Sequence, residues 1–117
     1  MIALDEFFQK QGCPEFASRE LVFIEDTHRK LMACIAAANS IYPKYQCELE
    51  ERQLLQSKAI GYAEILYQEF EWLIDLYPEK IGLFSQFAEK ASYEITLLRR
   101  WKKSNNKIRI DKSSHDV

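Results

Sequence analysis

The sequence predicts an all-α protein, an up-down bundle of three long helices with a short helix before them. Apolar residues recur at steps of three and four along three long segments, which is the period of a helix face. Only three Gly and three Pro occur among 117 residues, so the frequent turns of a β-sandwich, a barrel or a Rossmann-type fold are missing. With 47% hydrophobic residues, the chain has enough apolar side chains for the core of one domain.

The charges divide the chain into a body and a tail. Residues 1–98 contain 9 basic and 16 acidic side chains, whereas residues 99–117 contain 7 basic and 2 acidic ones. We expect a single helical domain over residues 1–104, followed by a flexible basic C-terminal tail over residues 105–117. Such an asymmetry between body and tail suggests a binding partner.

A short amphipathic segment opens the chain. Its apolar residues Leu4, Phe7 and Phe8 precede Gly12-Cys13-Pro14, and a glycine followed by a proline is an ordinary stop signal for a helix. The segment is too short to be stable alone. We therefore expect it to dock its two phenylalanine rings at one end of the bundle.

Two proline-containing breaks separate the long helices. The first long helix is expected over about Pro14–Asn39, because Tyr42-Pro43 pushes the chain out of the helical conformation. The last one starts after Tyr77-Pro78 and should end near Ser104-Asn105-Asn106, where asparagine is a suitable C-cap. Both carry heptad-spaced apolar stripes, which predict neighbours that cross at a shallow angle of roughly 20°.

The central helix, expected over about Gln46–Tyr77, organises the rest of the chain. More than half of its circumference is apolar, so it should be enclosed by several neighbours. At about 1.5 Å per residue it would be near 48 Å long, against roughly 36–38 Å for the other two, so it either bends near Gly61 or overhangs them. An apolar overhang predicts self-association or a permanent protein partner. Its main lane is Leu55, Ala59, Tyr62, Leu66, Phe70, Leu73 and Tyr77, flanked by Ile65, Trp72, Leu76, Tyr67 and Ile74.

Five large side chains are candidate anchors for such a partner, because aromatic residues often dominate interface energies. Each of them, taken singly, could equally complete an ordinary core. They are Phe23, Tyr67, Trp72, Ile74 and Trp101.

The basic C-terminal stretch is a candidate nucleic-acid contact. Cations with an aromatic ring among them suit phosphate contacts and base stacking, although cations also stabilise any helix C-terminus through the helix dipole. The residues concerned are Arg99, Arg100, Lys102, Lys103, Lys107 and Arg109, grouped around Trp101.

A metal site is the third candidate. Glu25 and His28 form one Glu-x-x-His, a spacing that directs both side chains inward in carboxylate-bridged metal bundles. Glu69 is the one further acid placed to join them, and the second motif that a dinuclear site requires is missing. We therefore predict no metal and no cofactor, and expect His28 to be a partly buried, hydrogen-bonded imidazole.

Catalysis and a membrane location are not supported by any motif. Cys34 lies six residues from His28 on a different helix face, and three glycines cannot build a P-loop or a dinucleotide fold. The three cysteines, Cys13, Cys34 and Cys47, fit no zinc spacing. No signal peptide and no apolar run of membrane-spanning length occur, so we expect a non-enzymatic protein of the reducing cytoplasm.

The preferred functional prediction is a non-catalytic helical interaction protein, which either forms a homo-oligomer or serves as an accessory or inhibitor-type subunit of another protein. The alternative is a helical accessory subunit of a nucleoprotein complex that holds RNA or DNA through its basic C-terminal stretch. A carboxylate and histidine metal-binding bundle is the second alternative.

Overall fold

The computed structural model describes the backbone of residues 14–110 and the side chains of residues 19–110. In this part of the chain every regular element is a helix, which confirms the all-α prediction. The elements are α2 (Pro14–Asn39), α3 (Gln46–Leu76), η1 (Pro78–Lys80), α4 (Ile81–Lys103) and η2 (Ser104–Lys107). The short helix predicted around Leu4, Phe7 and Phe8 lies outside the described residues, as does the end of the chain from residue 111 onwards.

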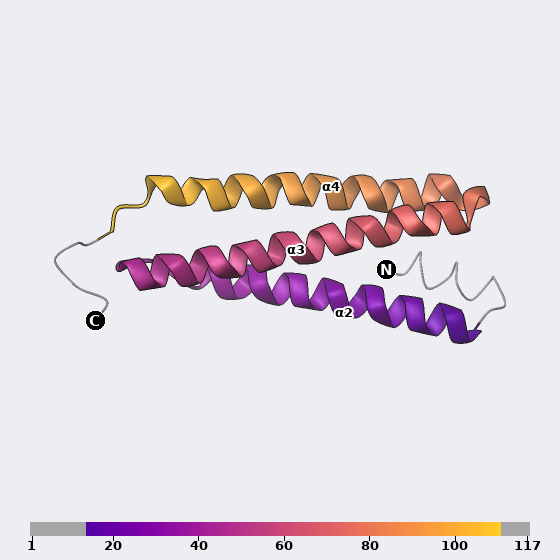
Figure 1. Ribbon diagram of the computed structural model, residues 1–117, viewed down its shortest axis with the longest axis horizontal. Helices are drawn as coiled ribbons and strands as arrows, with labels where there is room; N and C mark the ends of the chain where they lie inside the picture. Colours follow the sequence, from indigo (N-terminus) through magenta and orange to yellow (C-terminus); the bar gives the residue numbers. More distant parts are fainter. Residues whose placement is uncertain (1–13, 111–117) are drawn as a thin grey trace.

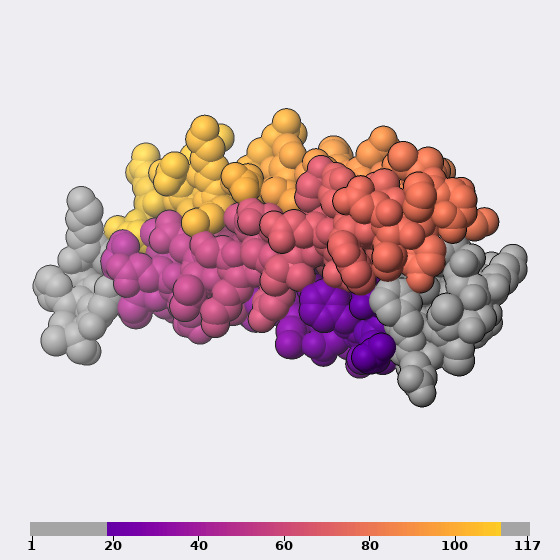
Figure 2. Space-filling model, turned by 45° about the vertical axis from the view of Figure 1, so that its right-hand side comes forward, coloured from indigo at the N-terminus to yellow at the C-terminus, as the bar shows by residue number. Residues whose placement is uncertain are grey.

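The three long helices lie side by side, with α3 in the middle and successive helices running in opposite directions (Figure 1). α2 packs along one side of α3 and α4 along another, whereas α2 and α4 scarcely contact each other. Figure 2 shows the surface of α3 between its two neighbours. The central helix is therefore not enclosed on all sides by the described helices, and an open groove remains between α2 and α4.

The core forms along the two contacts of α3. Ile24 of α2, Leu73 of α3 and Phe84 of α4 are fully buried. Aromatic rings join α3 to α4, since Phe70 stacks on Phe87 with ring centroids 5.3 Å apart. Two separate helix–helix contacts thus share one central helix, and burial of these apolar side chains is the main force that holds them.

The start of α3 is fixed by Glu48. Its Oε1 accepts hydrogen bonds from the backbone N–H groups of Lys44 at 3.0 Å and Tyr45 at 2.9 Å. These backbone donors lower the pKa of the Glu48 carboxyl below its ordinary value, because they stabilise its ionised form. The acidic cluster that begins at Glu48 thereby acts as a helix start.

At one end of the groove, Arg52 connects all three helices. Its Nη1 donates to the carbonyl oxygen of Ala38 in the last turn of α2 at 3.1 Å and to that of Ile41 just after the helix at 2.9 Å. Its Nε donates to Oδ1 of Asn105 at 3.1 Å, and its guanidinium lies 5.3 Å from the centre of the Trp101 ring. Arg52 therefore donates to two carbonyl oxygens at the C-terminal end of α2 and attaches that end to α4.

Asn105 is part of the folded domain. It lies in η2 and is 2% exposed, and its Nδ2 donates a hydrogen bond to Oε1 of the fully buried Gln56 on α3. From the sequence, Asn105 is predicted as a C-cap candidate at the start of a flexible tail. It is instead held in place because Arg52 and Gln56 supply the donor and the acceptor that a buried side-chain amide requires.

Candidate protein-binding groove

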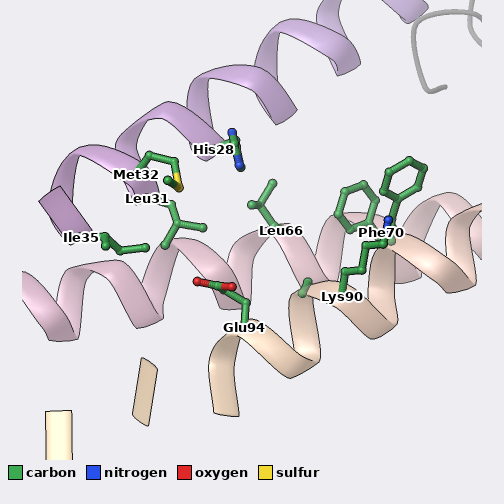
Figure 3. Close-up of a pocket in the computed structure, with 10 residues that line it drawn as sticks. His28, Leu31, Met32, Ile35, Leu66, Phe70, Lys90 and Glu94 are labelled. Carbon is green, nitrogen blue, oxygen red and sulfur yellow. The ribbon is translucent and has the colours of Figure 1, made fainter. Parts of the chain in front are cut away.

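The groove between α2 and α4 contains a largely apolar pocket with a volume of about 470 Å³ (Figure 3). Leu66 and Phe70 of α3 lie at its floor, and α2 and α4 supply its two walls. The full lining consists of His28, Leu31, Met32, Ile35, Leu66, Phe70, Phe87, Lys90, Ala91 and Glu94. A hollow of this size with a mostly apolar lining has the character of a ligand-binding pocket.

The α2 wall follows from helix periodicity. His28, Met32 and Ile35 succeed one another at steps of four and three, so their side chains form one row along α2. Leu31 is buried against α3 at 3% exposure, whereas Met32, one residue further, is 49% exposed. Met32 thus presents a flexible apolar side chain to the groove, and methionine adapts well to the shape of a partner.

The α4 wall combines apolar and charged groups. Phe87 is half-buried against Phe70, and the Nζ atom of Lys90 lies 5.8 Å from the centre of the Phe87 ring. Glu94 follows one turn after Lys90, so a positive and a negative side chain border the groove four residues apart. The charged groups that line the pocket can therefore orient a partner while the apolar surface provides the affinity.

The five predicted anchor residues come from all three long helices. Phe23 on α2 and Trp72 on α3 are 45% and 44% exposed, whereas Tyr67, Ile74 and Trp101 are half-buried and pack against the core. The Tyr67 hydroxyl hydrogen-bonds to Glu71, which raises the tyrosine pKa. None of the five lines the pocket.

The outer surface of α3 carries further exposed apolar side chains beside Trp72. Leu54, Ile65 and Leu76 are between 41% and 57% exposed. These positions recur along one side of the helix. The large apolar circumference inferred for the central helix is thus partly uncovered in the described part of the chain.

The predicted metal candidates do not come together. His28 is exposed at the groove, while Glu25 lines a separate shallow hollow with Arg19, Val22, Phe23, Asp26 and Arg29. Among the described residues, no three His, Cys, Asp or Glu side chains are arranged to hold a metal ion. His28 differs from the partly buried imidazole expected, because α4 does not close over that side of α2.

Glu69, a weak metal candidate from the sequence, is paired with the side chain of Glu20. Burial and a hydrogen bond to the Glu20 side chain raise its pKa to about 8. Its Oε1 atom is buried with no hydrogen-bond partner in the described structure. Glu69 therefore keeps its proton at neutral pH, because burial and the neighbouring Glu20 side chain both disfavour its ionised form.

The basic C-terminal residues divide into engaged and exposed groups. Nη2 of Arg99 forms an ion pair with Oε1 of Glu64 at 2.7 Å, and the guanidinium of Arg52 lies over the Trp101 ring. Stacking of a base on that face of Trp101 would therefore compete with Arg52. Lys102 is half-buried, and besides Arg99 the exposed cations are Arg100, Lys103, Lys107 and Arg109.

Sequence reasoning missed several residues that shape this groove. Arg52 and Gln56 continue the three-four lane of α3 towards its N-terminus, and polar residues in a core lane are a recognisable signal for a buried network. Lys90 and Glu94 lie outside the core stripe of α4, so the apolar pattern does not single them out. The structure places both in the lining of the pocket.

No known protein family, curated protein or solved structure matches this chain. In the described part of the chain, no helix is both long and apolar enough to span a membrane.

Proposed function

We propose that this protein is a non-catalytic protein-interaction module whose binding site is the groove between α2 and α4. The observation that carries the proposal is the separation of these two helices, which leaves a pocket of about 470 Å³ open along an apolar floor. In a four-helix bundle a fourth helix lies in such a groove. A helix supplied by a partner is the element that fits between two helices of this kind.

The composition of the groove supports a protein ligand over a small polar one. Leu31, Met32, Ile35 and Leu66 offer only apolar side chains, and the polar side chains of the lining are confined to His28, Lys90 and Glu94. An apolar centre with charged groups beside it is the usual arrangement of a protein interface.

Photocrosslinking in cells of the source organism tests this proposal. A photoreactive benzoylphenylalanine replaces Met32 in one variant and Ala33 in a matched control. Both positions are exposed, but consecutive helix residues point about 100° apart, so the control probe faces away from the groove. We expect a discrete adduct from position 32 and none from position 33. The absence of an adduct from position 32 would refute the proposal.

Nucleic-acid binding through the C-terminal cations is a second candidate, supported by the exposure of Arg100, Lys103, Lys107 and Arg109. Salt distinguishes it, because phosphate binding releases counterions and weakens steeply as ionic strength rises. Replacing these four cations by glutamine should abolish retention of single-stranded RNA or DNA at low salt. Retention that survives the replacement would rule this role out.

A further inference from the structure

The groove side of α4 carries six residues at alternating steps of four and three. They are Leu83, Phe87, Lys90, Glu94, Leu97 and Trp101. This is the heptad spacing of a coiled-coil seam, in which a second helix packs along one straight row. The residues that attach α4 to α3 most deeply, such as Phe84, Ala88 and Leu98, form the neighbouring row. Phe87 and Trp101 belong to the seam and also contact residues of α3, so a second helix would pack on their remaining exposed surface.

The pattern of apolar and charged positions along the seam is complementary to itself when the helix is reversed. Reversal about residue 92 exchanges Leu83 with Trp101, Phe87 with Leu97, and Lys90 with Glu94. Apolar positions therefore meet apolar positions, and opposite charges meet, when a second α4 lies antiparallel with its residue 92 opposite the first. A surface that is complementary to its own reversed copy is what a two-fold symmetric dimer requires.

Charge selects the orientation of the second helix. In a parallel pair centred on the same residue, Lys90 would face Lys90 and Glu94 would face Glu94 of the other copy. In the antiparallel pair each Lys90 faces a Glu94, and the symmetry makes this contact twice. Polar and charged positions inside a seam fix register and direction in this way.

The pocket lies at the same level of α4 as the centre of the seam. Its α4 lining runs from Phe87 to Glu94, on both sides of residue 92. A second α4 lying there would touch α4 on one side and the α2 row of His28, Met32 and Ile35 on the other. A stable interface buries about 800 Å² on each partner. The seam of 19 residues is about 28 Å long but only one row wide, so contact with α2 is needed to enlarge the buried area.

We propose that the partner in the groove is a second copy of this chain, and that two copies associate antiparallel through α4 with each α4 lying in the groove of the other. This inference rests on the proposed function, since it names the occupant of the same groove. Trp101, one of the five anchors predicted from the sequence, then packs at the end of the seam against Leu83 of the partner subunit. His28 and Met32 become covered by the second α4.

Sedimentation equilibrium of the purified full chain, with the variants K90E and E94K, tests the arrangement. The wild-type chain forms a dimer, and each single variant raises its dimer dissociation constant at least about tenfold, because two like-charge contacts arise per dimer. The double variant K90E/E94K restores the dimer. An equimolar mixture of the two single variants also restores association, because one chain then carries two negative seam residues and the other two positive ones.

Matched charge changes outside the seam are the controls. E89K on α4 and K58E on α3 alter exposed positions by the same charge, and neither changes the dissociation constant. The mixture separates contacts between chains from those within a chain, because an intrachain Lys90–Glu94 effect cannot be rescued by a second variant. Far-ultraviolet circular dichroism of every variant verifies that the helices remain folded.

Three results would overturn the second copy as occupant: a wild-type monomer at all concentrations, single variants that dimerise normally, or a mixture that stays monomeric. The photocrosslinking experiment keeps the two proposals apart. If position 32 forms an adduct with a different protein and the purified chain is a monomer, the proposed interaction module is supported and the dimer is refuted. An adduct with the mass of two chains supports both.

Discussion

Replacement of Arg52 by methionine should destabilise the fold more than any other single surface change. The side chain is half-buried and makes three hydrogen bonds of 2.9–3.1 Å, to Ala38, Ile41 and Asn105, and it covers the Trp101 ring. Methionine keeps the aliphatic stem and removes all of these contacts.

The expected loss follows from the contacts. A single hydrogen bond from a charged donor contributes about 1.5–3 kcal/mol to the free energy of unfolding. An exposed cation–π contact contributes about 0.5–1 kcal/mol. The three bonds share one guanidinium that is partly solvated, so their contributions are not additive. We expect R52M to lower the free energy of unfolding by about 3–4 kcal/mol, and R52K by about half as much, because lysine retains the charge without the planar fork.

Urea unfolding followed by circular dichroism measures this loss. Protein concentration is held constant, since association shifts apparent stability. R100M serves as the control, because Arg100 is exposed on α4; it should change the free energy of unfolding by less than about 0.5 kcal/mol. A loss below about 1 kcal/mol for R52M would show that Arg52 does not hold the ends of α2 and α4 together.

Three further predictions concern α3. The pKa of Glu69 is raised to about 8 in the folded protein, so the folded state retains a proton that the unfolded state loses. The free energy of unfolding therefore falls as pH rises from about 4.5 to 8. E69Q should flatten this part of the curve of urea midpoint against pH, and an unchanged slope would refute the prediction. G61A should raise the free energy of unfolding by about 0.5–1 kcal/mol, because an added Cβ meets no atom within 4 Å; a loss in thermal unfolding would mean that glycine is needed there. L73A should cost about 2–5 kcal/mol, because Leu73 is fully buried; a cost near that of the exposed control L54A would contradict this account of the core.

The sequence was sufficient to predict the bounds of two long helices. The expected ranges Pro14–Asn39 and Gln46–Tyr77 agree closely with α2 and α3, because heptad spacing and two Tyr-Pro pairs are local signals. Helix packing was harder to infer, since an apolar stripe indicates that a helix is covered without indicating by how many neighbours. Whether α2 and α4 touch depends on their angle around α3, which no local pattern encodes.

The candidate site was predictable only in part. Trp101 and Trp72 are predicted as interface anchors because they are large aromatic side chains, but Arg52 lies over the Trp101 ring, and Arg52 is 49 positions away in the sequence. The row of Lys90 and Glu94 is difficult to predict because it runs beside the more apolar core stripe of the same helix. Two adjacent heptad rows on one helix can be assigned to different neighbours only when the structure shows which row faces α3.

The scarcity of contact between α2 and α4 has a consequence for the way the chain folds. The extensive contacts between long helices join α2 to α3 and α3 to α4, so the described chain consists of two antiparallel hairpins that share α3. Chains with such local topology fold in microseconds to milliseconds. Either hairpin can form before the other, and the Arg52–Asn105 bond, which spans 53 residues, is expected to close last.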